Sequence, residues 1–242
     1  MRVIKLVMVN MGCLLLTIGS IARADPSLQL YLEGATYSDL TESWELSSPG
    51  GAARLWIIGY PFIGNQHTVI NDVRLAVAYA DDLAPTIELT PSTTGGLHNF
   101  ADPSVPTGTG TWIQTVTDGS APVLAGGGSL PDHGVYGPGT HWHEFALGDF
   151  TLIDSPVADF IDSVPDGSTA TKWGQINVYD VSISGAGHGD VFHFDTYDSF
   201  EGKTKGMFAP FSHDAETLPA PGAVVLGVIG LGLVGWIKRR FA

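Results

Sequence analysis

The chain has 242 residues, with 11 Lys and Arg against 25 Asp and Glu and a net charge of −14. Such an acidic chain repels nucleic acid, which excludes that class of partner, and its one cysteine, Cys13, excludes a disulfide framework. The length suits one domain with a processing segment at each end.

The first segment, residues 1–24, has the three parts of a secretory signal. Arg2 and Lys5 form a basic head, an apolar run follows, and Ala22-Arg23-Ala24 has the small-x-small pattern that signal peptidase accepts. We therefore expect a signal helix that engages the Sec translocon and is cleaved between Ala24 and Asp25. The alternative is an uncleaved N-terminal helix.

The exported part, residues 25–217, is predicted to be all-β. Short β-rich stretches alternate apolar with polar residues, as Leu28, Leu30 and Leu32 do, and Gly, Pro, Ser, Thr and Asp clusters separate them. Seven to ten such strands predict an antiparallel two-sheet β-sandwich, jelly-roll or Ig-like, between the signal helix and a C-terminal transmembrane helix. The clearest stretches are 28–37, 53–60, 72–80, 86–90, 143–153, 174–184 and 190–198.

Residues 92–138 are rich in Gly and Pro and predict a loop-rich insertion, with one strand around Trp112 and Ile113. The exported part holds five basic and 25 acidic residues and no cysteine. It must therefore be held together by its core, or by its core and an ion.

Two groups of residues invite a metal hypothesis. On a strand, His141 and His143 would share one face and could bind Zn²⁺ with a third ligand from elsewhere in the chain. Candidates for that third ligand are His188, His193, His213, Asp190 and Asp195. Ordinary hydrogen bonds are the alternative role of these histidines.

Acidic loops around Asp190 and Asp195, and around Asp81, Asp82 and Asp180, could hold one structural Ca²⁺, or they could form a solvated acidic surface. The sequence implies no other cofactor.

Motifs for catalysis are absent from the sequence. There is no nucleophile elbow, P-loop or dinucleotide fingerprint, although paired carboxylates of the glycosidase type leave no sequence signature. If exposed, the tryptophans of the domain could stack on sugars; most Trp residues in a sandwich are core. They are Trp44, Trp56, Trp112, Trp142 and Trp173.

The last segment, residues 218–242, has the features of a membrane anchor. Residues 222–237 carry no charge and predict a transmembrane helix, and Lys238, Arg239 and Arg240 would stay on the cytoplasmic side. The domain would then lie outside the membrane. A buried core helix, the alternative, would have no use for this basic cluster.

This tail is similar to the PEP-CTERM sorting tail, which has a Pro-Glu-Pro-like triplet, an apolar helix and a terminal Arg cluster. Pro219, Ala220 and Pro221 match the triplet in order, with Ala220 where the family usually has Glu. The resemblance implies recognition by a membrane transpeptidase of the exosortase class, which would remove the tail.

A second resemblance covers most of residues 28–216. The stretches "LQLYLEGATYSDLTESWEL", "RLWIIGY", "VFHFDTYD" and "FAPFSHDAE" resemble the exported bacterial proteins of the choice-of-anchor N family. This resemblance implies localisation and a sandwich fold, and it implies no reaction.

Together these features predict an exported, envelope-sorted surface or extracellular-matrix protein without catalytic activity, such as a biofilm component associated with exopolysaccharide. The alternative is a secreted carbohydrate-binding module or carbohydrate-active enzyme. A metal-dependent activity at His141 and His143 is a third hypothesis.

Overall fold

A computed structural model describes residues 27–41, 43–47, 53–63, 66–92, 110–124, 127–132, 134–163, 172–187, 190–198 and 214–218. The elements are β1 (Leu28–Leu32), β2 (Thr36–Ser38), β3 (Ser43–Ser47), β4 (Ala53–Gly59), β5 (Phe62–Ile63), β6 (Gln66–His67), β7 (Ile70–Ala80), β8 (Thr86–Pro91), β9 (Thr111–Val116), β10 (Thr140–Phe150), β11 (Ser155–Val157), α1 (Phe160–Ser163), β12 (Lys172–Ser184), β13 (Phe192–Tyr197) and β14 (Asp214–Leu218).

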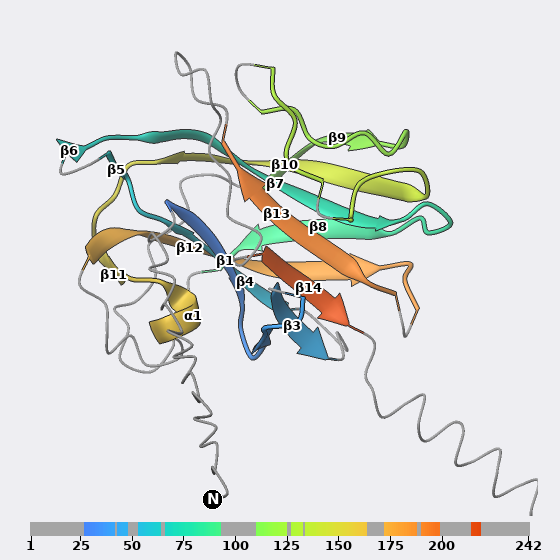
Figure 1. Cartoon of the computed structure of the whole chain (residues 1–242), viewed down its shortest axis with the longest axis horizontal. Helices are drawn as coiled ribbons and strands as arrows, with labels where there is room; N and C mark the ends of the chain where they lie inside the picture. The colour runs from blue at the N-terminus through green and yellow to red at the C-terminus, as the bar shows by residue number, and fades with distance from the viewer. Residues whose placement is uncertain are drawn as a thin grey trace, which may run out of the picture.

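The prediction of an all-β chain with antiparallel sheets is confirmed. Each of the seven stretches named above contains a strand, and β9 lies where one strand was expected in the insertion. A five-stranded sheet has the order β1-β4-β12-β11, with β8 also paired to β12. A seven-stranded sheet has the order β2-β3-β14-β13-β7-β10-β9, and β5 and β6 form a small ribbon (Figure 1).

The largest core contains residues from both large sheets. Leu30 and Ile57 come from the five-stranded sheet and Val77 and Phe145 from the seven-stranded sheet, and all four side chains are at most 1% exposed. Burial of aliphatic and aromatic surface is the main stabilising term for a domain without disulfides.

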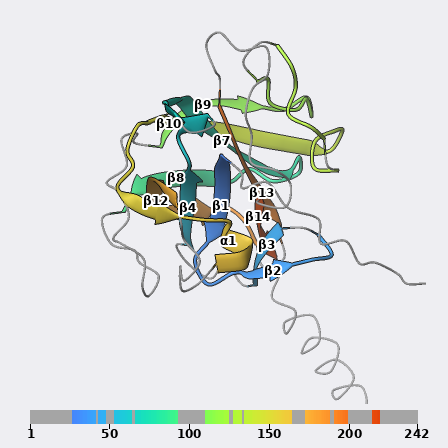
Figure 2. The same ribbon diagram turned by 60° about the vertical axis from the view of Figure 1, so that its left-hand side comes forward.

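Alternation of apolar and polar residues is typical of a strand with one solvated face, but both faces of β1 are buried. All five of its residues are buried, including Gln29 and Tyr31. The side-chain amide of Gln29 donates to the Ala158 carbonyl (2.8 Å) and accepts from the Phe160 amide (2.9 Å), so the segment that begins α1 covers this face (Figure 2). Gln29 is therefore a buried, hydrogen-bonded residue beneath the segment that begins α1, and this face of β1 is not solvated.

Part of the predicted insertion covers the other face of the seven-stranded sheet. Leu124, Leu130 and Tyr136, between β9 and β10, form a second core with Ala76, Ala78, Trp142 and Tyr197. The Trp142 indole also donates to the Ser120 carbonyl at 2.7 Å. Because Ala76 and Ala78 are small, the middle of this face has room for the covering side chains.

Strand β14 lies inside the seven-stranded sheet. It pairs antiparallel with β13 and parallel with β3, so both of its edges carry backbone hydrogen bonds. It extends to Leu218, the first residue of the predicted tail.

The predicted signal segment, with Ala22, Ala24 and Asp25, and the sorting residues Pro219 to Pro221 and Lys238 to Arg240 lie outside the described residues. Within the part of the chain that the structure describes, no helix has the length and apolar character needed to cross a membrane.

A tight backbone approach at Gly174 gives a test of this packing. A Cβ atom at this position would overlap the backbone oxygen of Gly59, whereas a Cβ at Gly128 would meet nothing within 4 Å. We expect Gly174→Ala to lower the free energy of unfolding by about 2 kcal/mol, as overpacked sites do. We expect Gly128→Ala to change it by less than about 0.5 kcal/mol. Urea unfolding followed by Trp fluorescence measures both, and equal effects would contradict the described β4–β12 packing.

Candidate functional site

The outer face of the seven-stranded sheet, opposite the largest core, carries a row of polar side chains. Glu144 on β10 pairs in register with Gln114 on β9 and with Ala76 on β7, and Ala76 pairs with Asp195 on β13. Residues directly opposite on neighbouring strands point to the same face, so these side chains share one surface of the sheet.

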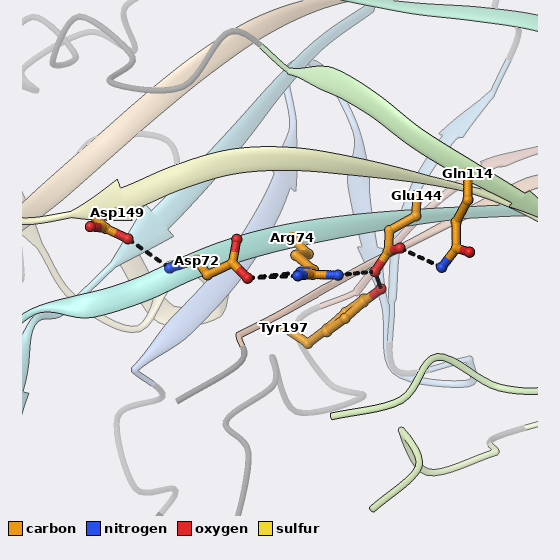
Figure 3. A network of polar contacts seen from close by, with 6 residues as sticks. All are labelled: Asp72, Arg74, Gln114, Glu144, Asp149 and Tyr197. Atoms are coloured by element: carbon orange, nitrogen blue, oxygen red, sulfur yellow. Dashed lines mark hydrogen bonds and ion pairs between the residues drawn. The ribbon is translucent and has the colours of Figure 1, made fainter. Parts of the chain in front are cut away.

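Glu144 is the centre of this row and is 3% exposed. Its Oε1 accepts from Arg74 Nη1 at 3.0 Å and from the Tyr197 hydroxyl at 2.7 Å. Its Oε2 accepts from the side-chain amide of Gln114 at 2.7 Å (Figure 3). Four strands thus meet at one carboxylate, and three donors compensate its buried charge.

Arg74 links this centre to Asp72 on the same strand. Its Nη2 donates to Asp72 Oδ2 at 2.6 Å and its Nε donates to the same oxygen at 3.2 Å. Asp72 has a φ of 48°, in the left-handed region, and its backbone amide donates to Asp149 Oδ1 at 2.8 Å. The register between β7 and β10 shifts near this point, so these contacts hold an irregular part of the pair together.

The network shifts the pKa values of two of its members. Burial raises the pKa of Tyr197 well above its ordinary value, and the neighbouring Glu144 carboxylate raises it further. For Arg74, burial acts to lower the pKa, but the hydrogen bonds from its guanidinium to Asp72 and Glu144 outweigh it and raise the value. Both groups therefore keep their protons at neutral pH.

A second polar group continues the row toward the end of the sheet. The Tyr136 hydroxyl donates to Asp195 Oδ2 at 2.5 Å, and Asp195 Oδ1 lies 3.4 Å from His193 Nε2. His193 and Asp195 are 6% and 2% exposed. This Tyr–Asp–His series fixes the imidazole of His193 at the wall of a surface hollow.

The hollow has a volume of about 570 Å³ and lies where β7 ends and β10 and β13 begin. Its lining residues are Ala78, Tyr79, Ala80, Asp82, Leu83, Gly134, Val135, Gly139, Thr140, Asp190, Val191 and His193. Its size is that of a small-molecule site, and its ionisable groups include two carboxylates and one imidazole.

The structure places the predicted metal ligands in two separate locations. His141 and His143 lie on β10 and contact the ring of Tyr79, with ring centroids 6.3 and 5.1 Å away, so they share one face as expected. Burial lowers the pKa of His143, which favours its neutral form.

The proposed third ligands that lie among the described residues do not join this pair. His193 and Asp195 lie on the opposite face of the sheet, because their cross-strand partners are Ala78 and Ala76 whereas His143 pairs with Val77. Asp190 lines the hollow with His193. Among the described residues no group of three or more His, Cys, Asp or Glu could hold a metal ion. His188 and His213 lie outside them.

The five tryptophans do not form a single platform. Trp44, Trp56 and Trp142 are at most 4% exposed, whereas Trp112 on β9 and Trp173 on β12 are 56% and 54% exposed. These two exposed rings belong to different sheets.

The Glu144 network was missed by reasoning from sequence. Arg74 lies in the strand "DVRLAVAYA" and Glu144 in "HWHEF", each as a charge among mostly apolar or aromatic residues. A lone charge in a stretch that is otherwise buried indicates a paired side chain, and this signal would have found both.

Comparisons with known proteins assign no family: no family model matches the chain, no curated protein matches it, and no solved structure matches it.

A double-mutant cycle tests the network. Arg74→Met removes a partner of a buried carboxylate and is expected to lower the free energy of unfolding by about 3 kcal/mol. The double variant Arg74→Met/Glu144→Met should cost about 2 kcal/mol less than the sum of the single variants, because it leaves no unpaired buried charge; Asp72, which also loses Arg74, is partly exposed.

Arg54 provides the matched control for this cycle. It lies 3.4 Å from Glu33 and from Asp180, and its side chain is 37% exposed. Arg54→Met should therefore cost less than about 1 kcal/mol. Additive effects at Arg74 and Glu144, or an equal effect at Arg54, would contradict a buried, coupled network.

The raised pKa of Tyr197 predicts a pH dependence. The unfolded chain loses this proton near pH 10, whereas the folded protein retains it, so the stabilising contribution is complete below about pH 10 and falls as the pH rises further. Tyr197→Phe removes this titration. The variant should therefore lose less free energy of unfolding between pH 8 and pH 11 than the parent protein, as measured by urea unfolding, and an identical loss would disprove it.

Proposed function

We propose that the chain is an exported bacterial protein of the cell envelope, cell surface or extracellular matrix, sorted by a processed C-terminal tail and without catalytic activity. Its N-terminal segment is a signal peptide that is cleaved before Asp25. The observation that carries the proposal is the end of the last strand. Strand β14 ends at Leu218, and the Pro219-Ala220-Pro221 triplet begins at the next residue.

This junction favours a removable tag over a structural segment. Every described strand lies before residue 219. Cleavage within residues 219–221 would therefore leave β14 paired with β3 and β13, and the domain would keep its described core. An exosortase-type transpeptidase could act on the tail without unfolding the protein.

We further propose that the domain is a two-sheet β-sandwich. Residues from the five-stranded and the seven-stranded sheet bury their side chains in one core, as expected when two sheets pack face to face. The exported part would depend on this core because it carries no cysteine.

The two buried acids of the outer face fit a structural role. Glu144 and Asp195 are 3% and 2% exposed, and both accept hydrogen bonds from tyrosine hydroxyls. Carboxylates that catalyse glycoside hydrolysis must instead reach a substrate in a cleft. The strongly acidic composition suits a hydrated matrix component that stays soluble.

The alternative is a secreted carbohydrate-binding module or carbohydrate-active enzyme, and the exposed rings of Trp112 and Trp173 favour it. Exposed aromatic rings can stack on sugars. Loss of exopolysaccharide retention in Trp112→Ala or Trp173→Ala, with unchanged stability, would support this alternative.

Intact mass spectrometry by cell fraction tests the proposed sorting. In the organism of origin, we expect a mass that begins at Asp25 and ends within residues 219–221, in the outer envelope or the medium. Replacing Lys238, Arg239 and Arg240 by Ala should leave the tail attached, because the positive-inside anchor is lost. Ala220→Glu, which restores the usual residue of the tail, serves as the control and should still be processed.

Two other masses would count against the proposal. A parent protein that retains Trp236 to Ala242 in the inner membrane would show a permanent anchor and contradict removal of the tail. Detection of residues 1–24 in the mature protein would contradict signal cleavage.

A further inference from the structure

The hollow at the end of the seven-stranded sheet has the features of a binding site. Its lining includes the small residues Ala78 and Ala80 on β7, together with Gly134 and Gly139, which have no side chain. His193 lines it from a buried position, fixed by Asp195 and through it by Tyr136. A buried imidazole held by a charged partner gives the wall a defined polar group and not a mobile one.

The charged residues that line the hollow indicate the charge that a ligand would carry. Among the residues that the structure describes, its lining includes Asp82 and Asp190 and contains neither Lys nor Arg. The charge of His193, when protonated, is balanced by Asp195 at 3.4 Å. Asp82 and Asp190 therefore give the site a net negative charge, which disfavours binding of an anion and favours binding of a cation.

The residues that line the hollow favour one class of cation over a metal ion or a quaternary ammonium group. The described part of the chain holds no group of three His, Cys, Asp or Glu for a bare metal ion, and Ca²⁺ requires six to eight oxygen ligands. A quaternary ammonium group requires aromatic faces. The ring of Tyr79 instead packs against His143 and Phe192, with centroids 5.1 and 6.1 Å away. A primary ammonium group, with three N–H donors, matches carboxylate and carbonyl acceptors directly.

We propose that this hollow binds a small organic molecule that carries a primary ammonium group beside hydroxyl groups, of about the size of an amino sugar. Asp82 and Asp190 accept from the ammonium group. Asp190 is already oriented, because its Oδ2 accepts from the Gly187 amide at 2.6 Å. The Thr140 hydroxyl, which donates to the Val135 carbonyl at 2.8 Å, can still accept a hydrogen bond from a hydroxyl of the ligand. This inference does not depend on how the tail is processed.

The probes are D-glucosamine, D-glucose and CaCl₂, titrated into the purified full-length chain in non-ionic detergent micelles. D-glucose differs from D-glucosamine by one hydroxyl in place of the ammonium group, so the pair isolates the charge. We expect D-glucosamine to bind at least about tenfold more tightly than D-glucose, because a charge-assisted hydrogen bond is lost. Amide chemical-shift changes should be confined to residues around the hollow, such as Gly134, Gly139 and Val191.

Three substitutions locate the site. Asp82→Asn and Asp190→Asn should each weaken D-glucosamine binding about tenfold. In Asp190→Asn the side-chain amide oxygen can still accept from Gly187, so the loop keeps this contact. Asp81→Asn is the matched control, because Asp81 is exposed in the same turn and does not line the hollow. It should change the affinity less than about twofold. Ala80→Leu fills the hollow without changing its charge and should abolish binding of both sugars.

Several results would overturn the proposal. Equal affinities for D-glucose and D-glucosamine would show that the carboxylates do not contribute to binding. Equal effects of Asp81→Asn and Asp82→Asn would indicate only the general field of an acidic surface. Displacement of D-glucosamine by CaCl₂ at equimolar concentration would make the site a metal site. Retained binding in folded Ala80→Leu would place the ligand elsewhere, and each variant is checked for folding by its amide spectrum.

Discussion

The buried carboxylate of Glu144 is the constraint around which the seven-stranded sheet is arranged. A charge at this position would be strongly destabilising alone, and it is tolerated because Arg74, Tyr197 and Gln114 all donate to it. Those donors come from β7, β13 and β9, so the strands must keep their register for the charge to stay compensated. The alternating hydrophobic pattern excludes a register shift of one residue but not a shift of two, whereas a single carboxylate with three fixed donors stabilises one register.

The same row of residues explains why the outer face needs a cover and where that cover ends. Ala76 and Ala78 leave space in the middle of the sheet, and Tyr136 and Trp142 fill it in a second core. Tyr136 also donates to Asp195, so the covering segment is held by a polar contact as well as by apolar packing. Beyond these side chains β7 ends in small residues, and the hollow beside His193 is the space that the cover leaves unfilled. The small side chains of Ala76 and Ala78 thus leave room both for the polar network around Glu144 and for the hollow beside His193.

The local pattern of the sequence located the long strands, but it missed short ones such as β3, β11 and β14, and it did not specify which strands pair. Alternation and turn residues located β4, β7 and β12 because both signals act over a few residues. The parallel pairing of β14 with β3 joins residues about 170 positions apart, and no local signal specifies it. Polar residues such as Gln29 in an alternating strand usually mark a solvated face, but in β1 the segment that begins α1 covers that face. The pair His141 and His143 was correctly placed on one face, but the register puts His193 on the other, which spacing along the chain could not predict.

The position of β14 connects the fold to the proposed sorting. If the C-terminus left by cleavage were attached to the envelope, load would pass directly to a strand that is hydrogen-bonded on both edges, by β13 on one side and β3 on the other. Force along the strand would act on both rows of bonds together, whereas an edge strand would share the load over one row. An envelope protein held by its C-terminus therefore gains more from an interior last strand than from an edge strand. Pro219, the residue after β14, has no N–H to donate to a strand ladder, and the proposed cleavage within residues 219–221 would leave the described pairings of β14 intact.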